Sequence, residues 1–180
     1  MNQQKQLSPE KYIRQNGLQL PFHESFINDD WKKEGMASVF ISKRMPSGKF
    51  IVGMYMVDLF CLGLKSTTFR FSLNELEYKE LYQKMFSSGN GIACELIFAH
   101  NLIFGAIDYA QDLGFEPEKE FEITRHLLDE SLIDDGIDEL EFGKNGQPLY
   151  FQGPHDNANH IIAILERNVG AGNYKIILAS

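Results

Sequence analysis

A long apolar stretch without proline, residues 92–114, constrains the fold of this chain more than any other feature. It reads IACELIFAHNLIFGAIDYAQDLG. At about 100° per residue, its apolar side chains fall on one broad helical face, while His100, Asn101 and Asp108 fall on the other. The stretch therefore predicts a central buried helix.

One charged residue of this stretch, Glu95, breaks the pattern. On a helix over 92–114 it projects from the apolar face beside Ala99 and Leu102. An ionised carboxylate there is costly unless another group pairs with it. Two interpretations remain open: a negative charge stabilising the first turn of the helix, or a functional carboxylate whose pKa is raised by desolvation.

The length and composition indicate an ordered protein with one core. With 180 residues, 43% of them hydrophobic, we expect a single globular domain over 1–180 with a flexible segment at 1–7. The polar start lacks the apolar core of a secretory signal, and no apolar run reaches the roughly 20 residues of a membrane span. Cys61 and Cys94 have no disulfide or zinc-site spacing. These features predict a cytoplasmic protein without membrane association, cofactor or bound metal.

The net charge of −8 is divided unevenly, because the first 90 residues carry a net +3 and the last 90 a net −11. An acidic chain is a poor general binder of nucleic acid, so another protein is the expected partner. The acidic run 129–139 is interpreted as a solvated surface that could contact a basic partner. Nucleic-acid contact through Lys43, Arg44 and Lys49 of a first hairpin is the weaker alternative.

The pattern of strands and helices predicts an α+β fold. From residue 37 the hydrophobic period changes to two, which indicates a hairpin across PSGK and a third strand in KSTTFRF. Asn145–Gly146 is the strongest signal for a second hairpin. Capping residues and apolar spacing predict helices over 8–17, 73–86 and 158–169, another helix after Pro117, and a last strand near the C-terminus. We expect a mainly antiparallel sheet, built from two hairpin segments, with helices packed against it.

Asp58 is a candidate site residue because its strand face otherwise carries Met54, Met56 and Phe60. It could accept hydrogen bonds from a neighbouring loop, as buried polar groups usually do. It could also be a carboxylate with a raised pKa that acts as a general acid, a general base or a metal ligand.

His155 is the third candidate, in the segment GPHDN between a predicted strand and a predicted helix. In a functional interpretation the loop presents backbone N–H groups to an anion, with His155 as acid, base or ligand. In the structural alternative, Pro154 bends the chain and Asp156 or Asn157 caps the following helix.

Around Trp31, Gly35 and the run YMVDLFCLGLK, the chain resembles a family of uncharacterised bacterial proteins. The likeness extends to AHNLIFGAI and to ELEFGKNGQP. The resemblance implies a discrete bacterial domain, and it transfers no activity and no catalytic residue.

No motif in the chain specifies a reaction. The nucleophile elbow, the phosphate-binding loop, the dinucleotide fingerprint and the common zinc motifs are all missing from the sequence. The leading hypothesis is a non-catalytic protein-binding or regulatory module. The alternative is a hydrolase, with or without a metal, in which Asp58, Glu95 and His155 converge. The sequence leaves open whether the protein is an enzyme and what its oligomeric state is.

Overall fold

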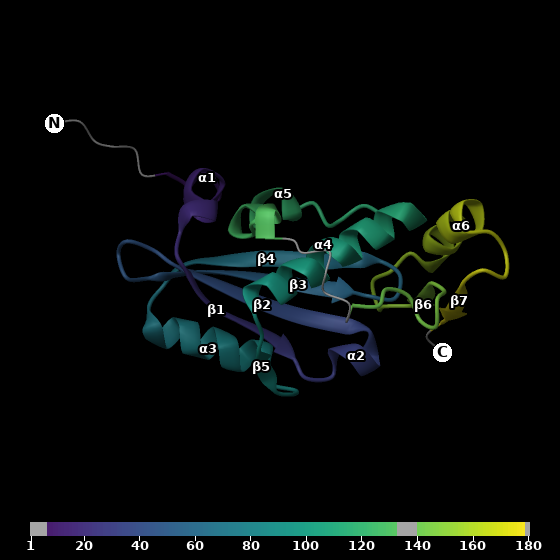
Figure 1. Cartoon of the computed structure of the whole chain (residues 1–180), viewed down its shortest axis with the longest axis horizontal. Helices are drawn as coiled ribbons and strands as arrows, with labels where there is room; N and C mark the ends of the chain where they lie inside the picture. Colours follow the sequence, from purple (N-terminus) through teal and green to yellow (C-terminus); the bar gives the residue numbers. More distant parts are fainter. Residues whose placement is uncertain (1–6, 133–139, 179–180) are drawn as a thin grey trace.

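The fold consists of an antiparallel sheet with helices on both faces (Figure 1). The computed structural model describes residues 7–132 and 140–178. Five strands lie in the order β4-β3-β2-β1-β5, with the bounds β1 (Phe22–Asn28), β2 (Met36–Arg44), β3 (Phe50–Asp58), β4 (Gly63–Leu73) and β5 (Gly91–Ala93). The helices are α1 (Pro9–Asn16), α2 (Trp31–Glu34), α3 (Glu75–Met85), α4 (Leu96–Leu113), α5 (Phe121–Thr124) and α6 (Ala158–Asn168). The predicted α+β class is thus confirmed. Residues 1–6 of the segment 1–7 that was expected to be flexible, and residues 133–139 of the acidic run 129–139, lie outside the described residues.

One face of the sheet is covered by α1, α4 and α5. Four central side chains of this face, Val39, Ile41, Tyr55 and Val57, are only 0–1% exposed. The Tyr55 hydroxyl also donates a hydrogen bond of 2.9 Å to the carbonyl oxygen of Thr124 at the end of α5. We call this the closed face.

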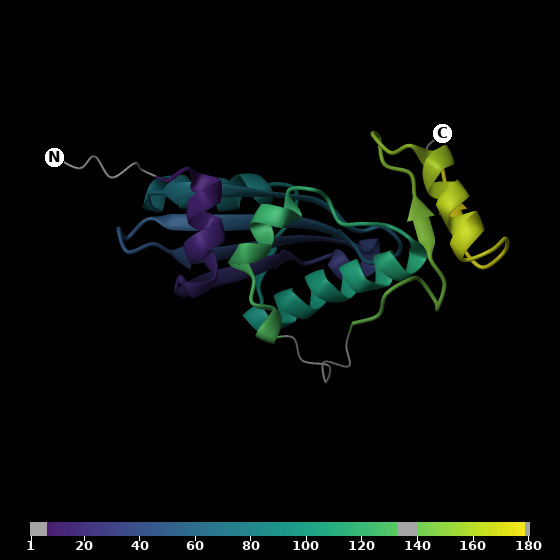
Figure 2. The same ribbon diagram turned by 90° about the horizontal axis from the view of Figure 1, so that it is seen from above.

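The opposite face is covered by α3 (Figure 2). Asn74 begins this helix with a capping box, in which its side chain accepts from Leu76 and Glu77 N–H and Glu77 bonds back to Asn74 N–H. Tyr78 and Phe86 of the helix pack on Phe40 and other apolar residues of β2 and β3. The helix is 11 residues long and covers only part of this face, which we call the open face.

The central helix is real, but its expected start was wrong. Gly91–Ala93 forms β5, in which Ile92 lies opposite Ile27 of β1, and the helix begins only at Leu96. The apolar residues of this short strand continue the helical pattern, so periodicity alone could not separate the two elements. His100 and Asn101 were also expected on the polar side, whereas both are buried.

The C-terminal segment forms a small unit at one end of the main sheet (Figures 1 and 2). Asn145 and Gly146 make the expected tight turn, with φ of 53° and 75°, but it closes only a single bridge between Lys144 and Gln147. The next strand, β6 (Leu149–Phe151), pairs in parallel with β7 (Lys175–Ile177). The second hairpin is therefore much smaller than expected.

Candidate functional site

Asp58 holds together the turn that follows β3. Its Oδ1 accepts hydrogen bonds from the backbone N–H groups of Phe60, at 2.9 Å, and Cys61, at 3.1 Å. The side chain is 5% exposed. Burial raises the pKa of Asp58 above its usual value, although the backbone N–H groups and nearby Lys65 oppose the shift. This arrangement agrees with the loop-organising interpretation of Asp58.

Glu95 lies apart from Asp58. It precedes the first residue of α4, is exposed, and makes no capping hydrogen bond with its side chain. The expectation that it projects from the apolar face of the helix was wrong, because the helix starts after it. Gly63, opposite Asp58 on β4, packs against Ala106 and Ala110. At about 1.5 Å per residue, these alanines lie roughly 15 Å or more along α4 from Glu95.

His155 is exposed in the turn before α6, beside a well-anchored Asp156. Asp156 Oδ2 accepts from Gly153 N–H at 2.8 Å and forms a 3.1 Å ion pair with Lys65 Nζ. Although burial opposes the shift, these two contacts and the Tyr150 hydroxyl lower the pKa of Asp156. The structure thus links the regions of Asp58 and His155 through Lys65 and Asp156, and it leaves Glu95 elsewhere.

Of the three basic residues predicted to contact nucleic acid, one is turned into the protein. Lys43 is 5% exposed, and its Nζ donates hydrogen bonds to the carbonyl oxygens of Gly17, at 2.9 Å, and Leu18, at 3.0 Å. Its ammonium is therefore turned into the protein, away from any nucleic acid. Arg44 and Lys49 are exposed, with Arg44 lying 4.8 Å from the centre of the Phe50 ring.

The two cysteines are poorly placed for nucleophilic chemistry. Cys61 is fully buried, and burial raises the pKa of its thiol and of the partly buried Cys94 thiol. Among residues 7–132 and 140–178, no three His, Cys, Asp or Glu side chains are grouped so that they could hold a metal ion.

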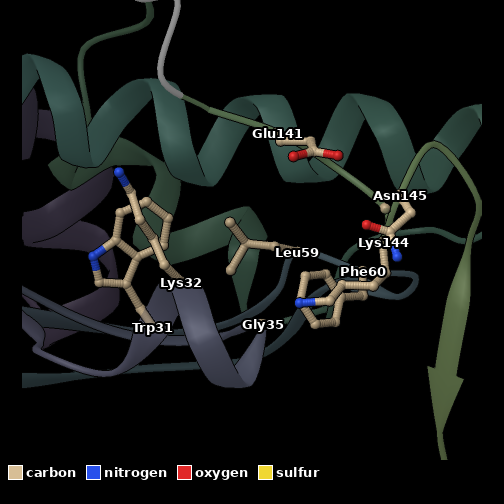
Figure 3. A pocket seen from close by; sticks show the side chains of 9 residues that line it. Trp31, Lys32, Gly35, Leu59, Phe60, Glu141, Lys144 and Asn145 are labelled. Atoms are coloured by element: carbon tan, nitrogen blue, oxygen red, sulfur yellow. The ribbon is translucent and has the colours of Figure 1, made fainter.

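A pocket of about 280 Å³ lies above the turn that Asp58 organises (Figure 3). We call it the Leu59–Phe60 pocket after the two residues at its base. Its walls come from α2 and the residue that ends it, and from a loop of the C-terminal segment; they are Trp31, Lys32, Gly35, Glu141, Gly143, Lys144 and Asn145.

Backbone hydrogen bonds join these distant segments at the pocket. Leu59 N–H donates to Gly35 O at 2.9 Å, and Gly143 N–H donates to Leu59 O at 2.9 Å. On the far side of the turn, Leu149 N–H donates to Phe60 O at 3.0 Å. Three parts of the chain therefore position the base of the pocket.

Gly35 allows the close packing at the base of the pocket. It ends α2 with φ of 69°, a conformation that favours glycine. A Cβ at this position would lie 2.1 Å from the Phe60 ring. Any side chain there would both strain the backbone and displace Phe60.

Charged side chains flank the pocket on two sides. Lys144 Nζ lies 4.9 Å from the centre of the Phe60 ring, and Lys32 Nζ lies 5.3 Å from the centre of the Trp31 ring. Figure 3 shows the Glu141 carboxylate over the space between Leu59 and Phe60. Within the described part of the chain, no salt bridge joins Glu141 to Lys144.

A second candidate surface lies on the open face, beyond the reach of α3. Met56, on a central strand, is 45% exposed, and its neighbours Met36 and Met54 are partly exposed. The cross-strand pairs Ser38–Met56–Ser66 and Met54–Thr68 place polar residues around them. We call this set the methionine face; it consists of Met36, Ser38, Met54, Met56, Ser66 and Thr68.

A cavity of about 250 Å³ continues the methionine face toward α2 and the end of α3. Met36, Met85 and Phe86 supply its apolar walls, and Asp30 and Glu34 supply two carboxylates. No lysine or arginine is among the described residues that line it. We call it the acidic cavity.

Sequence reasoning missed both surfaces. Met54 and Met56 were interpreted only as apolar neighbours of Asp58. The sequence signals that fell near the pocket were the predicted turn at Asn145, which lines it, and Asp58, which organises its base.

Comparison of the chain with protein-family models, with curated proteins and with solved structures found no match. The resemblance to a family of uncharacterised bacterial proteins therefore stays a prediction. No helix in the described part of the chain is both long and apolar enough to cross a membrane.

Proposed function

We propose that this protein is a non-catalytic binding module that recognises a basic amphipathic segment of another protein through the methionine face. The observation that carries the proposal is the 45% exposure of Met56 on β3. Strands in the middle of a sheet normally bury their apolar side chains under another layer. Here that layer is incomplete, so a partner that completes it would remove apolar surface from water.

Methionine suits such a surface. Its unbranched, polarizable side chain adapts to different partners, and methionine-rich surfaces recur where proteins bind amphipathic helices. Ser38, Ser66 and Thr68 surround the methionines with small polar groups. A helix lying beside α3 could place its apolar side chains on this face.

The charges around the face favour a basic partner. The acidic cavity offers Asp30 and Glu34 next to Met36, and the 3.2 Å ion pair of Glu34 with Lys33 is exposed. A lysine or arginine of the partner could place its aliphatic stem on the methionines and its charge near the carboxylates, in competition with Lys33. A second copy of the chain is disfavoured because each copy carries a net charge of −8.

The test uses a synthetic amphipathic helix of leucine and lysine, titrated into the full chain by calorimetry. We expect the Met56→Ser variant to bind at least about tenfold more weakly, because it removes apolar contact at the centre of the face. Leu76→Ser is the matched control, since Leu76 is 66% exposed on α3 outside the methionine face. A Glu34→Gln variant should weaken binding less, and this effect should shrink at high salt.

Three results would contradict the proposal. They are equal binding by the wild type and Met56→Ser, equal binding of a control helix in which glutamate replaces lysine, and a stable dimer of the free protein that Met56→Ser dissociates. The last result would assign the face to a second copy of the chain.

A further inference from the structure

We propose that the Leu59–Phe60 pocket binds a free amino acid with an apolar or aromatic side chain. The proposal concerns a small molecule at a different surface, so it is independent of the partner proposed for the methionine face. It is based on the size of the pocket, its apolar base and the opposite charges of Glu141 and Lys144 at its rim, which no salt bridge joins within the described residues.

The size and the base limit the ligand to a small molecule with an apolar part. The volume of about 280 Å³ is just below the roughly 300–1,000 Å³ of pockets that hold drug-sized ligands. Leu59 and Phe60 form the base, and Trp31, 8% exposed, forms a wall. One large side chain of a ligand could pack against these three residues.

The charges favour a ligand that carries both signs. Lys144 lies against the Phe60 ring, and the Glu141 carboxylate lies on the opposite side of the pocket, next to α4 (Figure 3). The described lining carries two lysines, Lys32 and Lys144, and one glutamate, Glu141, so a ligand with both a carboxylate and an ammonium meets an opposite charge for each group. An amino acid satisfies both residues, with its carboxylate at Lys144 and its ammonium at Glu141.

The turn at Asn145–Gly146 places a further polar group at the same rim. The left-handed conformations of Asn145 and Gly146, together with the 2.7 Å hydrogen bond from Lys144 N–H to Gln147 O, fix the position of Lys144 and Asn145. Figure 3 shows the Asn145 amide beside Lys144. An amide can donate to a ligand carboxylate and accept from a ligand ammonium.

The backbone contacts make the pocket a preformed site. Because Gly35, Leu59 and Gly143 are joined by hydrogen bonds, little ordering is needed when a ligand binds. The proposal for this pocket concerns binding only.

The test is a titration of the full chain with L-phenylalanine and L-leucine, followed by two-dimensional NMR. We expect saturable shifts at residues around the pocket, with dissociation constants in the range of about 0.1–10 mM. N-acetyl-phenylalanine lacks the ammonium, phenylalanine amide lacks the carboxylate, and glycine lacks the side chain. Each of the three should bind at least about tenfold more weakly than phenylalanine.

Two variants test the contributions of Lys144 and Glu141 separately. Lys144→Met keeps the stem over Phe60 and removes the charge, so it should weaken phenylalanine binding about tenfold and change the binding of phenylalanine amide little. Glu141→Gln removes the charge expected beside the ligand ammonium. It should weaken phenylalanine binding about tenfold and change the binding of N-acetyl-phenylalanine little. Lys79→Met is the control, because Lys79 is an exposed lysine of α3.

The proposal is overturned if no amino acid shifts the pocket resonances at about 10 mM. It is also overturned if Lys144→Met and Lys79→Met bind phenylalanine as the wild type does, or if the blocked derivatives bind equally well. Binding of a leucine–lysine helix to the methionine face would be unaffected by each of these outcomes.

Discussion

The two faces of the sheet are built from the same strands and differ sharply in how far they exclude water. On the closed face, Ile41 and Val57 are fully buried, and even the ionisable Lys43 and His100 are 5% and 1% exposed. On the open face, Met56, the residue next to Val57, is 45% exposed. The closed face therefore provides stability, whereas the open face retains apolar surface that is available for binding.

The largest expected difference between the two faces is in the stability lost when one of their apolar side chains is shortened to alanine. Ile41→Ala on the closed face should lower the free energy of unfolding by about 2–5 kcal/mol, because it leaves a cavity in a closed core. Met56→Ala on the open face should change it by no more than about 0.5 kcal/mol. Urea denaturation of both variants measures the two values. Similar losses for both would mean that the faces are equally important for stability.

A second prediction concerns acid stability, through His100 in α4. Its ring nitrogens have no hydrogen-bond partner within the described structure. Burial, assisted by the positive charge of Lys43 and opposed by Asp129, lowers the pKa of His100 from 6.5 to about 4. The unfolded chain then binds the proton more readily than the folded chain, so the folded state loses stability as pH falls from about 6.5 to about 4.

This loss amounts to up to about 3 kcal/mol for a shift of that size. His100→Leu removes the titrating group, so its stability should fall less than that of the wild type over the same pH range. Denaturation at pH 7 and at pH 4 gives the comparison. If the two proteins lose the same amount, His100 is not protonated more readily in the unfolded chain.

The smallest expected effect on stability concerns α3, the helix that covers part of the open face. Asn74→Ala removes the cap of α3 and should cost about 1 kcal/mol. Because α3 is the helix that covers the apolar cluster around Phe40 within the described residues, we also expect faster amide hydrogen exchange in α3 than in α4. Equal exchange rates in the two helices of this variant would contradict the idea of a weakly held cover.

Features that depend on neighbouring residues could be predicted from the sequence. The sequence offers Ser8 as a cap for the first helix and either Ser72 or Asn74 for the helix over 73–86. In the structure, Ser8 and Asn74 each accept a backbone hydrogen bond from a residue three positions later. The Asn145–Gly146 turn was predicted for the same reason, because two residues with positive φ suffice to form it.

Features that depend on distant parts of the chain could not be predicted. The β1 strand was missed, and Ile92 was assigned to a helix, because the pairing of β1 with β5 is visible only in the fold. For candidate sites, Asp58 was identified by its apolar neighbours, but its partners are the N–H groups of its own turn. The Leu59–Phe60 pocket combines three segments that are distant in the sequence. Hydrophobic periodicity carries no information about which distant segments lie together.

The short helix α2 borders both proposed binding surfaces. Trp31 and Lys32 line the Leu59–Phe60 pocket, while Glu34, one turn later, lines the acidic cavity beside the methionine face. A movement of α2 would therefore alter both sites at once. By thermodynamic reciprocity, if one position of α2 favours both the pocket ligand and the protein partner, each of them raises the affinity of the protein for the other by the same factor.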